Sequence, residues 1–315
     1  MRGMARIFVT RELPGPALTK LKETHETVVW PGELPPSYAE LCAQAAQSDA
    51  LLTLLTDRVD AELIAASPKL RVIANYAVGY DNIDVDAASA AGIPVGNTPD
   101  ALTEATADLT FALLMAAARR IPEAASFARN GQWQTWEPAA FLGADVYGAT
   151  IGIIGLGRIG QAVARRAAGF GMEVLTTETR DQHNLEHLLR RSDFVSIHLP
   201  LTDGTRGLID ADALALMKPT AILINTARGP IVDREALAQA LHTGQIAGAA
   251  LDVTSPEPLP PGDPLWQAPN LLVVPHIGSA TWSARERMTE IAVENVLAGL
   301  EGRSLPCQVP QQLFD

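Results

Sequence analysis

The chain has 315 residues, of which 47% are hydrophobic and 19% are charged, and its formal net charge is −12 at pH 7. This share of apolar residues excludes a disordered chain, and the length predicts two domains. An acidic chain without a basic cluster argues against nucleic acid as a partner.

The cysteines and the longest apolar stretch bear on where the protein works. Cys42 and Cys307 lie far apart without metal-ligand spacing, which predicts a reducing compartment and no metal site. The N-terminus lacks the apolar stretch of a signal peptide. Residues 109–118 are the longest apolar stretch, well short of the roughly 20 residues that cross a membrane. We therefore expect a soluble, cytoplasmic protein with no membrane partner.

Residues 5–97 alternate short apolar runs with amphipathic segments. Strands are predicted at RIFVT, ALLTLL, LRVIAN and IPVGN, and helices between them at PALTKLKET, YAELCAQAA and DAELIAAS. This alternation predicts a parallel sheet covered by helices on both faces. A long helix is expected next, from Asp100 to Arg119, and then a loop rich in tryptophan and glycine.

A second alternating series begins at residue 150. Its six predicted strands are TIGIIGLG, MEVLTT, FVSIHLP, AILINTA, AGAALDV and NLLVVP. The segment TWSARERMTEIAVENVLAGLEG predicts one C-terminal helix that stops at a glycine and returns to the first domain. The fold class predicted from these patterns is α/β, with two doubly wound parallel-sheet domains and a boundary near residue 98.

A glycine motif stands between the first strand and the first helix of the second series. Gly155, Gly157 and Gly160 have the GxGxxG spacing, and this strand–helix context is the one that dinucleotide binding requires. Gly155 allows a tight turn, Gly157 lets the backbone approach a pyrophosphate, and Gly160 lets helix and strand pack closely. The pyrophosphate would lie on the helix N-terminus. The cofactor-binding residues predicted here are Gly155, Leu156, Gly157, Arg158, Ile159 and Gly160.

Two charged residues after the second strand of this series bear on which dinucleotide is bound. Glu178 stands about where an acidic side chain accepts hydrogen bonds from the ribose 2′-hydroxyl, which favours NAD(H). Arg180 would instead accommodate a 2′-phosphate and favour NADP(H). We expect NAD(H), with NADP(H) as the alternative.

Chemically active residues follow three later strands. AILINTARG delivers Arg228, AGAALDVTSPEP delivers Asp252 and Glu257, and NLLVVPHIGS delivers His276. Because parallel strands end at one edge of a sheet, these residues should gather beside the glycine motif. Arg228 would hold a carboxylate and polarise a carbonyl, and His276 would protonate the carbonyl oxygen as hydride arrives at its carbon. Glu257, if bonded to the imidazole, would favour its protonated form and fix its orientation.

The chain resembles the D-isomer-specific 2-hydroxyacid dehydrogenase family, most closely the glyoxylate/hydroxypyruvate reductases. The resemblance covers residues about 72 to 300 and rests on NYAVGYDNIDVDAASAAGIPVGNTPD, GIIGLGRIGQAVARR, SDFVSIHLPLT, INTARGPIVD, GAALDVTSPEPLP and LVVPHIGSAT. It implies that the catalytic residues are Arg228, Glu257 and His276, and that Asp252 faces the nicotinamide carboxamide. It also implies a dinucleotide site that includes Pro200, Thr226 and Gly278.

The same resemblance implies a substrate site and a dimer. The backbone amides of Val78 and Gly79 would receive the substrate carboxylate, and Arg285 matches a substrate-side arginine. GQWQTWEPAAFLG resembles a loop whose second tryptophan, here Trp136, reaches the active site of a second subunit and favours substrates the size of hydroxypyruvate. The implied protein is a homodimer that acts on a small 2-oxo or 2-hydroxy acid.

The resemblance also assigns roles to the two predicted domains. Residues 1–97 and 283–315 would form a flavodoxin-like substrate-binding domain. Residues 98–282 would form a Rossmann-type dinucleotide-binding domain, with a dimerisation loop at about 120–147. The implied reaction is NAD(P)H-dependent reduction of glyoxylate or hydroxypyruvate to glycolate or D-glycerate.

One segment departs from the family pattern. Between MEVLTTETR and SDFVSIHLP only DQHNLEHLLR remains, so the third strand of the nucleotide-binding sheet is expected to be lost, along with part of the adenine pocket. His183 and His187 are spaced i, i+4 there, but no third ligand accompanies them, so we interpret both as surface residues.

Other functions stay open on the sequence. Another D-2-hydroxy acid, including phosphoglycerate, would use the same chemistry, although no basic cluster for a phosphate is visible. Formate dehydrogenases replace the glutamate partner of the histidine with glutamine, and Glu257 argues against them. Some relatives are non-catalytic, dinucleotide-sensing corepressors with extensions for partner proteins, which this chain almost entirely lacks.

Overall fold

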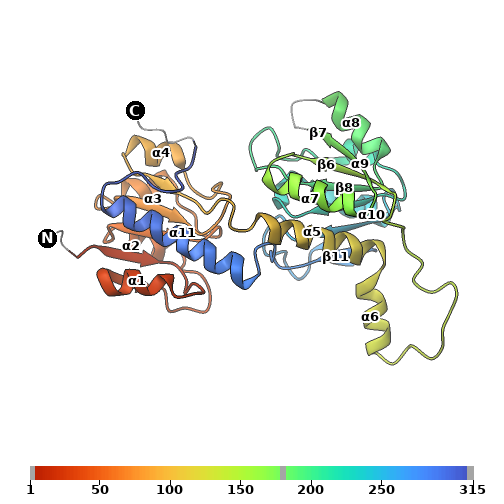
Figure 1. Cartoon of the computed structure of the whole chain (residues 1–315), viewed down its shortest axis with the longest axis horizontal. Helices are drawn as coiled ribbons and strands as arrows, with labels where there is room; N and C mark the ends of the chain where they lie inside the picture. Colours follow the sequence, from red (N-terminus) through yellow and green to blue (C-terminus); the bar gives the residue numbers. More distant parts are fainter. Residues whose placement is uncertain (1–3, 178–181, 311–315) are drawn as a thin grey trace. The chain divides into compact units, whose positions relative to one another are not determined.

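The computed structural model describes residues 4–177 and 182–310, and the chain divides into two compact units. Unit 1 contains Met1–Leu102 and Ala280–Asp315, and unit 2 contains Thr103–Ser279. The first boundary lies slightly later than residue 98, because Asn97 and Thr98 bond to unit 1 backbone and Leu102 packs on its core. Figure 1 shows both units, with the helices and several strands of unit 2 labelled.

Unit 1 is built on a five-stranded parallel sheet with strand order β2-β1-β3-β4-β5. Its strands are β1 (Arg6–Val9), β2 (Glu26–Val29), β3 (Ala50–Thr53), β4 (Val72–Asn75) and β5 (Val95–Gly96). The sequence pattern did not predict β2, which is an edge strand with no buried residue. The other four strands are confirmed.

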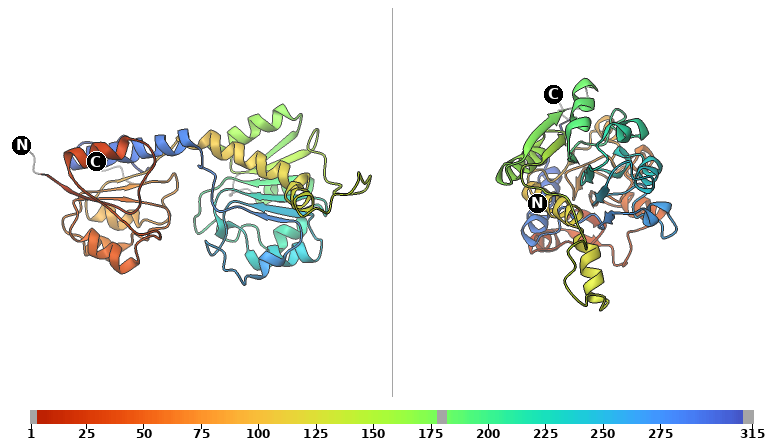
Figure 2. Two further views of the ribbon diagram at one scale, coloured as in Figure 1. Left: turned by 90° about the horizontal axis from the view of Figure 1, so that it is seen from below. Right: turned by 90° about the vertical axis from the view of Figure 1, so that its right-hand side faces the viewer.

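Helices cover both faces of this sheet, as Figure 2 shows. They are α1 (Ala17–Thr24), α2 (Tyr38–Ala45), α3 (Ala61–Ala65), α4 (Val85–Ala90) and α11 (Trp282–Leu300). Side chains alternate along each strand, so Ile7 and Val9 pack with α1 and α11, whereas Phe8 packs with α2 and α3. The C-terminal helix therefore completes the core of unit 1.

Unit 2 contains a six-stranded parallel sheet with strand order β11-β10-β9-β8-β6-β7. The strands are β6 (Thr150–Ile154), β7 (Glu173–Thr177), β8 (Phe194–Ile197), β9 (Ile222–Asn225), β10 (Gly248–Leu251) and β11 (Leu271–Val273). All six were predicted. Over the described residues β7 is an edge strand, in agreement with the expected loss of the next strand.

The helices of unit 2 also lie on both faces of their sheet (Figure 2). α5 (Thr103–Ala118) and α7 (Arg158–Gly169) cover one face, and α8 (Gln182–Arg191), α9 (Ala211–Leu216) and α10 (Arg234–His242) cover the other. Two short 3₁₀ helices, Gly229–Ile231 and Pro264–Gln267, follow β9 and β10. Both sheets are thus doubly wound, which confirms the predicted fold class.

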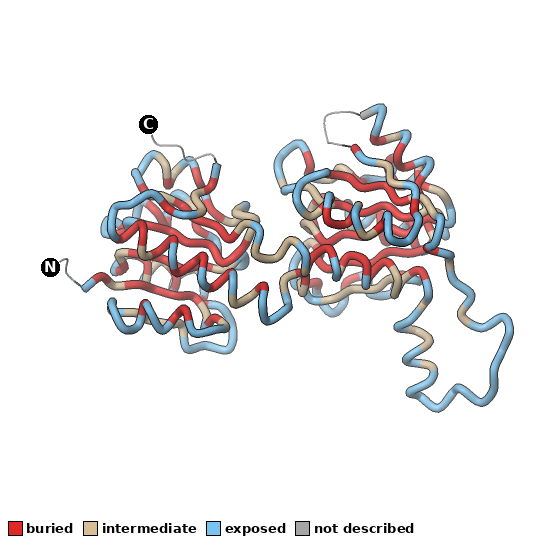
Figure 3. Tube along the Cα trace, in the orientation of Figure 1, coloured by how far each residue is buried: buried red, intermediate tan, exposed pale blue. Residues whose placement is uncertain are grey.

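An arm projects from unit 2 between α5 and β6 (Figure 1). It consists of α6 (Ile121–Arg129) and the segment up to residue 148, and the sequence pattern predicted it as loop alone. Arg120, at φ 51°, turns the chain between α5 and α6, and a proline follows in the first turn of α6. No residue of α6 is buried, as the pale and tan tube of Figure 3 shows.

No described helix is both long and apolar enough to span a membrane.

Candidate active site

The candidate site of unit 2 lies at the carboxyl edge of its sheet, where β6, β9, β10 and β11 end. Gly155 follows β6 at φ +97°, a backbone conformation that glycine adopts without strain. A Cβ added there would stand 2.6 Å from the His198 carbonyl oxygen, and one added at Gly160 would stand 2.1 Å from the Gly155 carbonyl oxygen. These two glycines therefore pack the turn tightly.

Gly157 differs from its two neighbours in the motif. It is the N-cap of α7, its side-chain position meets nothing within 4 Å, and α7 has no side-chain cap. Open space thus lies directly against the amide end of a 12-residue helix. A helix N-terminus of this kind binds phosphate groups, so the residues fit the pyrophosphate of a dinucleotide.

The remaining predicted cofactor residues lie on the same edge or outside the described chain. Leu156 and Pro200 are exposed, and Arg158 and Ile159 begin α7. Glu178 and Arg180 lie outside the described residues, so the prediction about NAD and NADP stays a prediction. His183 and His187 are exposed on α8.

Arg228 follows β9 and is half-buried. Asn225, the last residue of β9, is buried and donates from Nδ2 to the Arg228 carbonyl oxygen at 2.9 Å. Asn225 Oδ1 also accepts from the Ala227 N–H at 3.0 Å. One side chain therefore folds this loop back on the strand and fixes where Arg228 lies. The sequence analysis did not single out Asn225, although its position at a strand end was a signal.

His276 and Glu257 form a hydrogen-bonded pair. His276 Nδ1 donates to Glu257 Oε1 at 2.5 Å, because the ionised carboxylate only accepts. Their side chains are 24% and 35% exposed, so both are partly accessible to solvent. His276 Nε2 has no hydrogen-bond partner among the described residues and is the atom left to give a proton to a ligand.

Asp252 fixes the loop that carries His276. It is buried, and its two carboxylate oxygens accept from the backbone N–H groups of Ile277 at 2.6 Å and Gly278 at 2.8 Å. Its carbonyl oxygen accepts from the His276 N–H at 2.9 Å. His276 itself has φ 52°, a left-handed conformation that is uncommon outside glycine. The loop is therefore held in an unusual conformation by one aspartate.

Burial raises the pKa of Asp252, and the two N–H groups and the nearby His276 offset only part of this effect. Both carboxylate oxygens are already occupied by the backbone. Within this unit the Asp252 carboxylate thus anchors the loop that carries His276. The contact with the nicotinamide carboxamide that the family resemblance implies would be a second role of the same residue.

Three threonines lie at this edge of the sheet: Thr106, Thr110 and Thr226. Thr106 Oγ1 donates to the Gly278 carbonyl oxygen at 3.1 Å, and a Cβ at Gly278 would stand 3.0 Å from Asp252 Oδ2. Thr226 is buried, and its hydroxyl lies 3.0 Å from that of Thr110. Helix α5 therefore contributes Thr106 and Thr110 to this edge, which the sequence analysis missed because both lie within an apolar helical pattern.

His198, at the end of β8, is a second histidine at this edge. Burial lowers its pKa to about 3, and its Nε2 lies 2.8 Å from the Ser196 hydroxyl. It is therefore neutral near pH 7 and is not the proton donor.

The predicted substrate residues Val78, Gly79 and Arg285 lie in unit 1. Val78 and Gly79 are half-buried in the loop after β4. Arg285 lies in the first turn of α11, where its carbonyl oxygen accepts from the Tyr76 hydroxyl at 2.9 Å. Its Nε is buried and has no hydrogen-bond partner among the described residues.

Trp136 lies on the arm of unit 2 and is 79% exposed. Trp133 and Leu142, on the same arm, are similarly exposed. Phe127 and Phe141 meet edge to face at 5.2 Å and join α6 to the segment that follows it. The arm thus presents several large apolar side chains to solvent within one chain.

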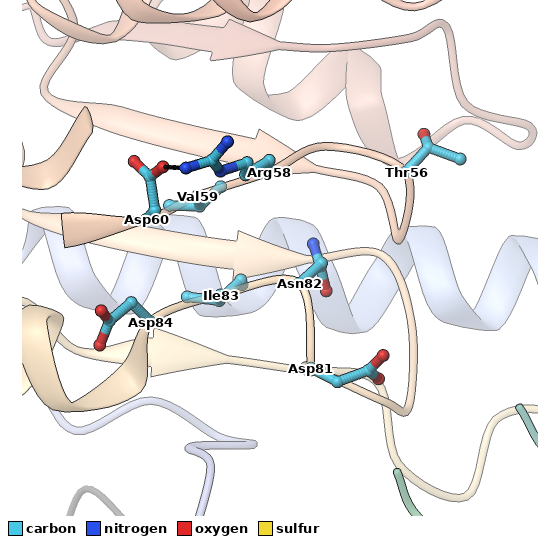
Figure 4. Close-up of a pocket in the computed structure, with 8 residues that line it drawn as sticks. All are labelled: Thr56, Arg58, Val59, Asp60, Asp81, Asn82, Ile83 and Asp84. Carbon is cyan, nitrogen blue, oxygen red and sulfur yellow. Dashed lines mark ion pairs between the residues drawn. The ribbon is translucent and has the colours of Figure 1, made fainter. Parts of the chain in front are cut away.

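Two cavities of the structure are lined by residues other than Arg228, Glu257 and His276. One, of about 360 Å³ in unit 1, is shown in Figure 4 and is lined by Thr56, Arg58, Val59, Asp60, Asp81, Asn82, Ile83 and Asp84. Arg58 pairs there with Asp60 at 2.6 Å. The other, of about 570 Å³, lies in unit 2 beside Arg206 and Arg234. No group of three or more potential metal ligands occurs in the part of the chain that the structure describes.

Comparison with known proteins agrees with this geometry. Residues 111–278 match the model of the D-isomer specific 2-hydroxyacid dehydrogenase NAD binding domain. The glyoxylate reductase of Korarchaeum cryptofilum is 50% identical over 320 residues, which cover 98% of this chain and 96% of that protein.

Solved structures are similar over nearly the whole chain. The TT0316 protein of Thermus thermophilus superimposes with a TM-score of 0.91 at 50% identity, covering 96% of this chain and 99% of that one. The NADPH-dependent glyoxylate/hydroxypyruvate reductase of Sinorhizobium meliloti, in complex with NADP and malonate, has a TM-score of 0.88 at 33% identity and covers 99% of this chain and 98% of that one.

Proposed function

This chain belongs to the D-isomer specific 2-hydroxyacid dehydrogenase family, and we propose that it reduces glyoxylate to glycolate with a reduced nicotinamide dinucleotide. The observation that carries the proposal is the His276–Glu257 pair at the end of β11, in the same unit as the glycine motif. The similarity to glyoxylate reductases over 98% of the chain supports the choice of substrate.

The proposed reaction consumes one proton and one hydride. The nicotinamide, when bound, supplies the hydride to the carbonyl carbon of glyoxylate. His276 Nε2 gives its proton to the carbonyl oxygen, and Glu257 stabilises the imidazolium before transfer and orients the ring afterwards. Arg228 polarises the carbonyl and holds the carboxylate in a bidentate contact. Hydroxypyruvate would be reduced to D-glycerate by the same steps.

The roles of the other predicted residues follow from the family resemblance. We propose that the dinucleotide is held by residues 155–160 at the start of α7, together with Pro200, Thr226, Asp252 and Gly278. We propose that the substrate carboxylate is bound by the Val78 and Gly79 amides, with Arg285 on the substrate side. NADH is the expected cofactor if Glu178 binds the ribose 2′-hydroxyl, and NADPH is expected if Arg180 binds the 2′-phosphate.

We propose that a second copy of the chain covers the arm. A single chain exposes Trp133, Trp136 and Leu142 by 69% or more, and apolar side chains gathered in this way mark interaction sites. A homodimer would bury them and bring Trp136 to the partner subunit. Sedimentation at micromolar concentration should give a dimer mass, and Trp136→Glu should shift it toward the monomer. A monomeric wild-type protein would contradict this assembly.

The activity is tested by following NADH and NADPH absorbance with glyoxylate, hydroxypyruvate and pyruvate. We expect rapid oxidation with glyoxylate or hydroxypyruvate, and the ratio between the two cofactors separates Glu178 from Arg180. Oxidation only with pyruvate would indicate another D-2-hydroxy acid dehydrogenase. Binding of NADH without turnover on any of these acids would favour a dinucleotide sensor.

A further inference from the structure

The loop after β4 accepts hydrogen bonds at three successive carbonyl groups. The carbonyl oxygen of Ala77 accepts from the Thr98 N–H at 2.9 Å, and that of Val78 accepts from Asn97 Nδ2 at 2.7 Å. The carbonyl oxygen of Gly79 accepts from Asn75 Nδ2 at 2.9 Å. All three carbonyl groups are therefore committed to the body of unit 1.

This arrangement determines where the N–H groups of the loop point. In a trans peptide the carbonyl and the following N–H point in opposite directions. The N–H of Val78 therefore points away from Thr98, and the N–H of Gly79 points away from Asn97. Neither N–H has a hydrogen-bond partner within the described ranges, and both residues are only half-buried. Successive unpaired N–H groups facing outward form a concavity that binds anions.

We propose that Asn97 and Asn75 are positioning residues for the substrate carboxylate: Asn97, through the Val78 carbonyl, orients the Gly79 N–H, and Asn75, through the Gly79 carbonyl, holds the next peptide of the loop in place. The inference rests on the proposed function and names the side chains that build its carboxylate site. Neither asparagine contacts the ligand; each acts through a backbone carbonyl of the loop.

The contacts of Asn97 separate the role of its backbone from that of its side chain. Its N–H donates to the Cys307 carbonyl oxygen at 3.0 Å, and its own carbonyl oxygen accepts from Asn295 Nδ2 at 3.0 Å. The backbone of Asn97 is thus clamped on both sides by the C-terminal part of unit 1. Its amide group is buried, and among the described residues its Nδ2 donates to the Val78 carbonyl oxygen alone.

Asn75 is likewise fixed in one orientation. It is fully buried, its Oδ1 accepts from the Thr53 hydroxyl at 3.2 Å, and its Nδ2 also donates to Asn82 Oδ1 at 3.1 Å. Asn82, labelled in Figure 4, donates in turn to the carbonyl oxygens of Leu54 and Asp57 at 3.0 and 2.9 Å. The loops after β3 and β4 are therefore tied together, and Asn75 fixes the peptide that follows the anion-binding N–H pair.

The test replaces each asparagine by aspartate, which has the same shape but carries an acceptor oxygen in place of the donor Nδ2. In Asn97→Asp and Asn75→Asp a carboxylate oxygen would face a carbonyl oxygen, so the loop would turn away. The probe is oxalate, a dicarboxylate without a reducible carbonyl, titrated into the NADH complex by calorimetry. We expect oxalate affinity and glyoxylate KM each to worsen about tenfold or more, the value of one lost hydrogen bond. NADH affinity should stay unchanged and kcat should change little.

Ser67→Ala is the matched control, because it removes an equally buried side-chain donor of unit 1, to the Leu63 carbonyl oxygen, that contacts neither Asn97 nor the loop. It should lower the melting temperature while oxalate affinity stays at the wild-type value. Asn97→Ala, which removes the donor without adding a charge, serves if Asn97→Asp does not fold, and its oxalate affinity should fall in the same direction.

The outcomes separate this inference from the proposed function. Wild-type oxalate affinity in the folded Asn97 and Asn75 variants overturns the positioning role alone, as does an equal loss of oxalate affinity in Ser67→Ala. A wild-type protein that binds oxalate but does not reduce glyoxylate overturns the proposed function, while the variants still report on the loop. A wild-type protein that does not bind oxalate overturns both.

Discussion

Asp252→Asn tests whether one buried carboxylate holds His276 in place. The carboxylate accepts from the N–H groups of Ile277 and Gly278, and it is 2% exposed. An amide side chain accepts with one oxygen only, so one of the two N–H groups would face another donor. A buried donor without an acceptor costs roughly 1–3 kcal/mol. Because burial raises the pKa of Asp252, the amide also relieves the cost of burying a charge.

The net fall in unfolding free energy is therefore expected near the lower end of that range, about 1 kcal/mol. The larger effect should be on catalysis, because His276 leaves its left-handed conformation when the loop relaxes. We expect kcat to fall about tenfold to hundredfold, the size typical of a displaced catalytic group. Steady-state kinetics with glyoxylate and urea unfolding measure the two quantities on the same samples.

Asp263→Asn is the matched control for Asp252→Asn. Asp263 is a buried aspartate of the same unit that accepts from the Leu265 N–H at 2.9 Å and pairs with Arg234 at 2.6 Å. It should lose comparable stability and keep kcat within about twofold, because it does not touch the loop of His276. Equal losses of kcat in both variants, or wild-type kcat in Asp252→Asn, would refute the anchoring role.

The raised pKa of Asp252 also determines whether its contribution to the unfolding free energy rises or falls with pH. The folded protein binds more protons at Asp252 than the unfolded chain between the ordinary value of 3.8 and the raised folded value. The contribution of Asp252 to the unfolding free energy therefore decreases as the pH rises through this window and is constant above it. The stability difference between wild type and Asp252→Asn should move in that direction across an acid series; the opposite slope would contradict the assigned cause.

Three further predictions concern the glycine motif, the second histidine and the Arg228 loop. Gly157→Ala should keep wild-type stability, because its Cβ meets nothing within 4 Å, but should weaken dinucleotide binding about tenfold or more in a fluorescence titration; Gly160→Ala should be destabilised by its contact with the Gly155 carbonyl. Because burial lowers the pKa of His198 from 6.5 to about 3, the unfolding free energy should fall by up to roughly 1.4 kcal/mol per unit as the pH drops below 6.5. His198→Gln should flatten this slope in urea unfolding, and an unchanged slope would contradict the assignment. Asn225→Asp, which keeps the acceptor for Ala227 and loses the donor to Arg228, should raise the glyoxylate KM several-fold with unchanged NADH affinity; a wild-type KM would show that Arg228 is placed by other contacts.

The sequence predicted elements whose pattern spans several residues. The inner strands of unit 2, β6, β8, β9 and β10, were predicted because a strand buried on both faces is a continuous apolar run bounded by glycine, proline or polar residues. The edge strands β7 and β11 were also predicted, although neither is fully buried. The half-exposed edge strand β2 has no such run. Helix α6 was missed because its apolar face meets no core within one chain, and because α5 and α6 are separated only by a turn at Arg120.

The part of the site that could be predicted is the set of residues that follow the carboxyl ends of the parallel strands. That logic brought Arg228, Asp252, Glu257 and His276 to one edge, and the structure pairs His276 with Glu257. The position of a residue at a strand end does not specify which hydrogen bonds its side-chain atoms form. Both Asp252 carboxylate oxygens accept from backbone N–H groups, and Asn225 donates to the Arg228 carbonyl oxygen. These contacts depend on loop conformations, such as the φ of His276, that the residue pattern does not predict.

The central claim is that His276 donates the proton when hydride reduces a 2-oxo acid. The most direct test is NADH oxidation by wild type and by His276→Ala, with glyoxylate varied at saturating cofactor and NADH affinity measured separately. The account predicts rapid turnover by wild type and a fall in kcat of roughly 10²- to 10⁴-fold in the variant, at unchanged NADH affinity. Equal turnover by the two proteins would contradict it.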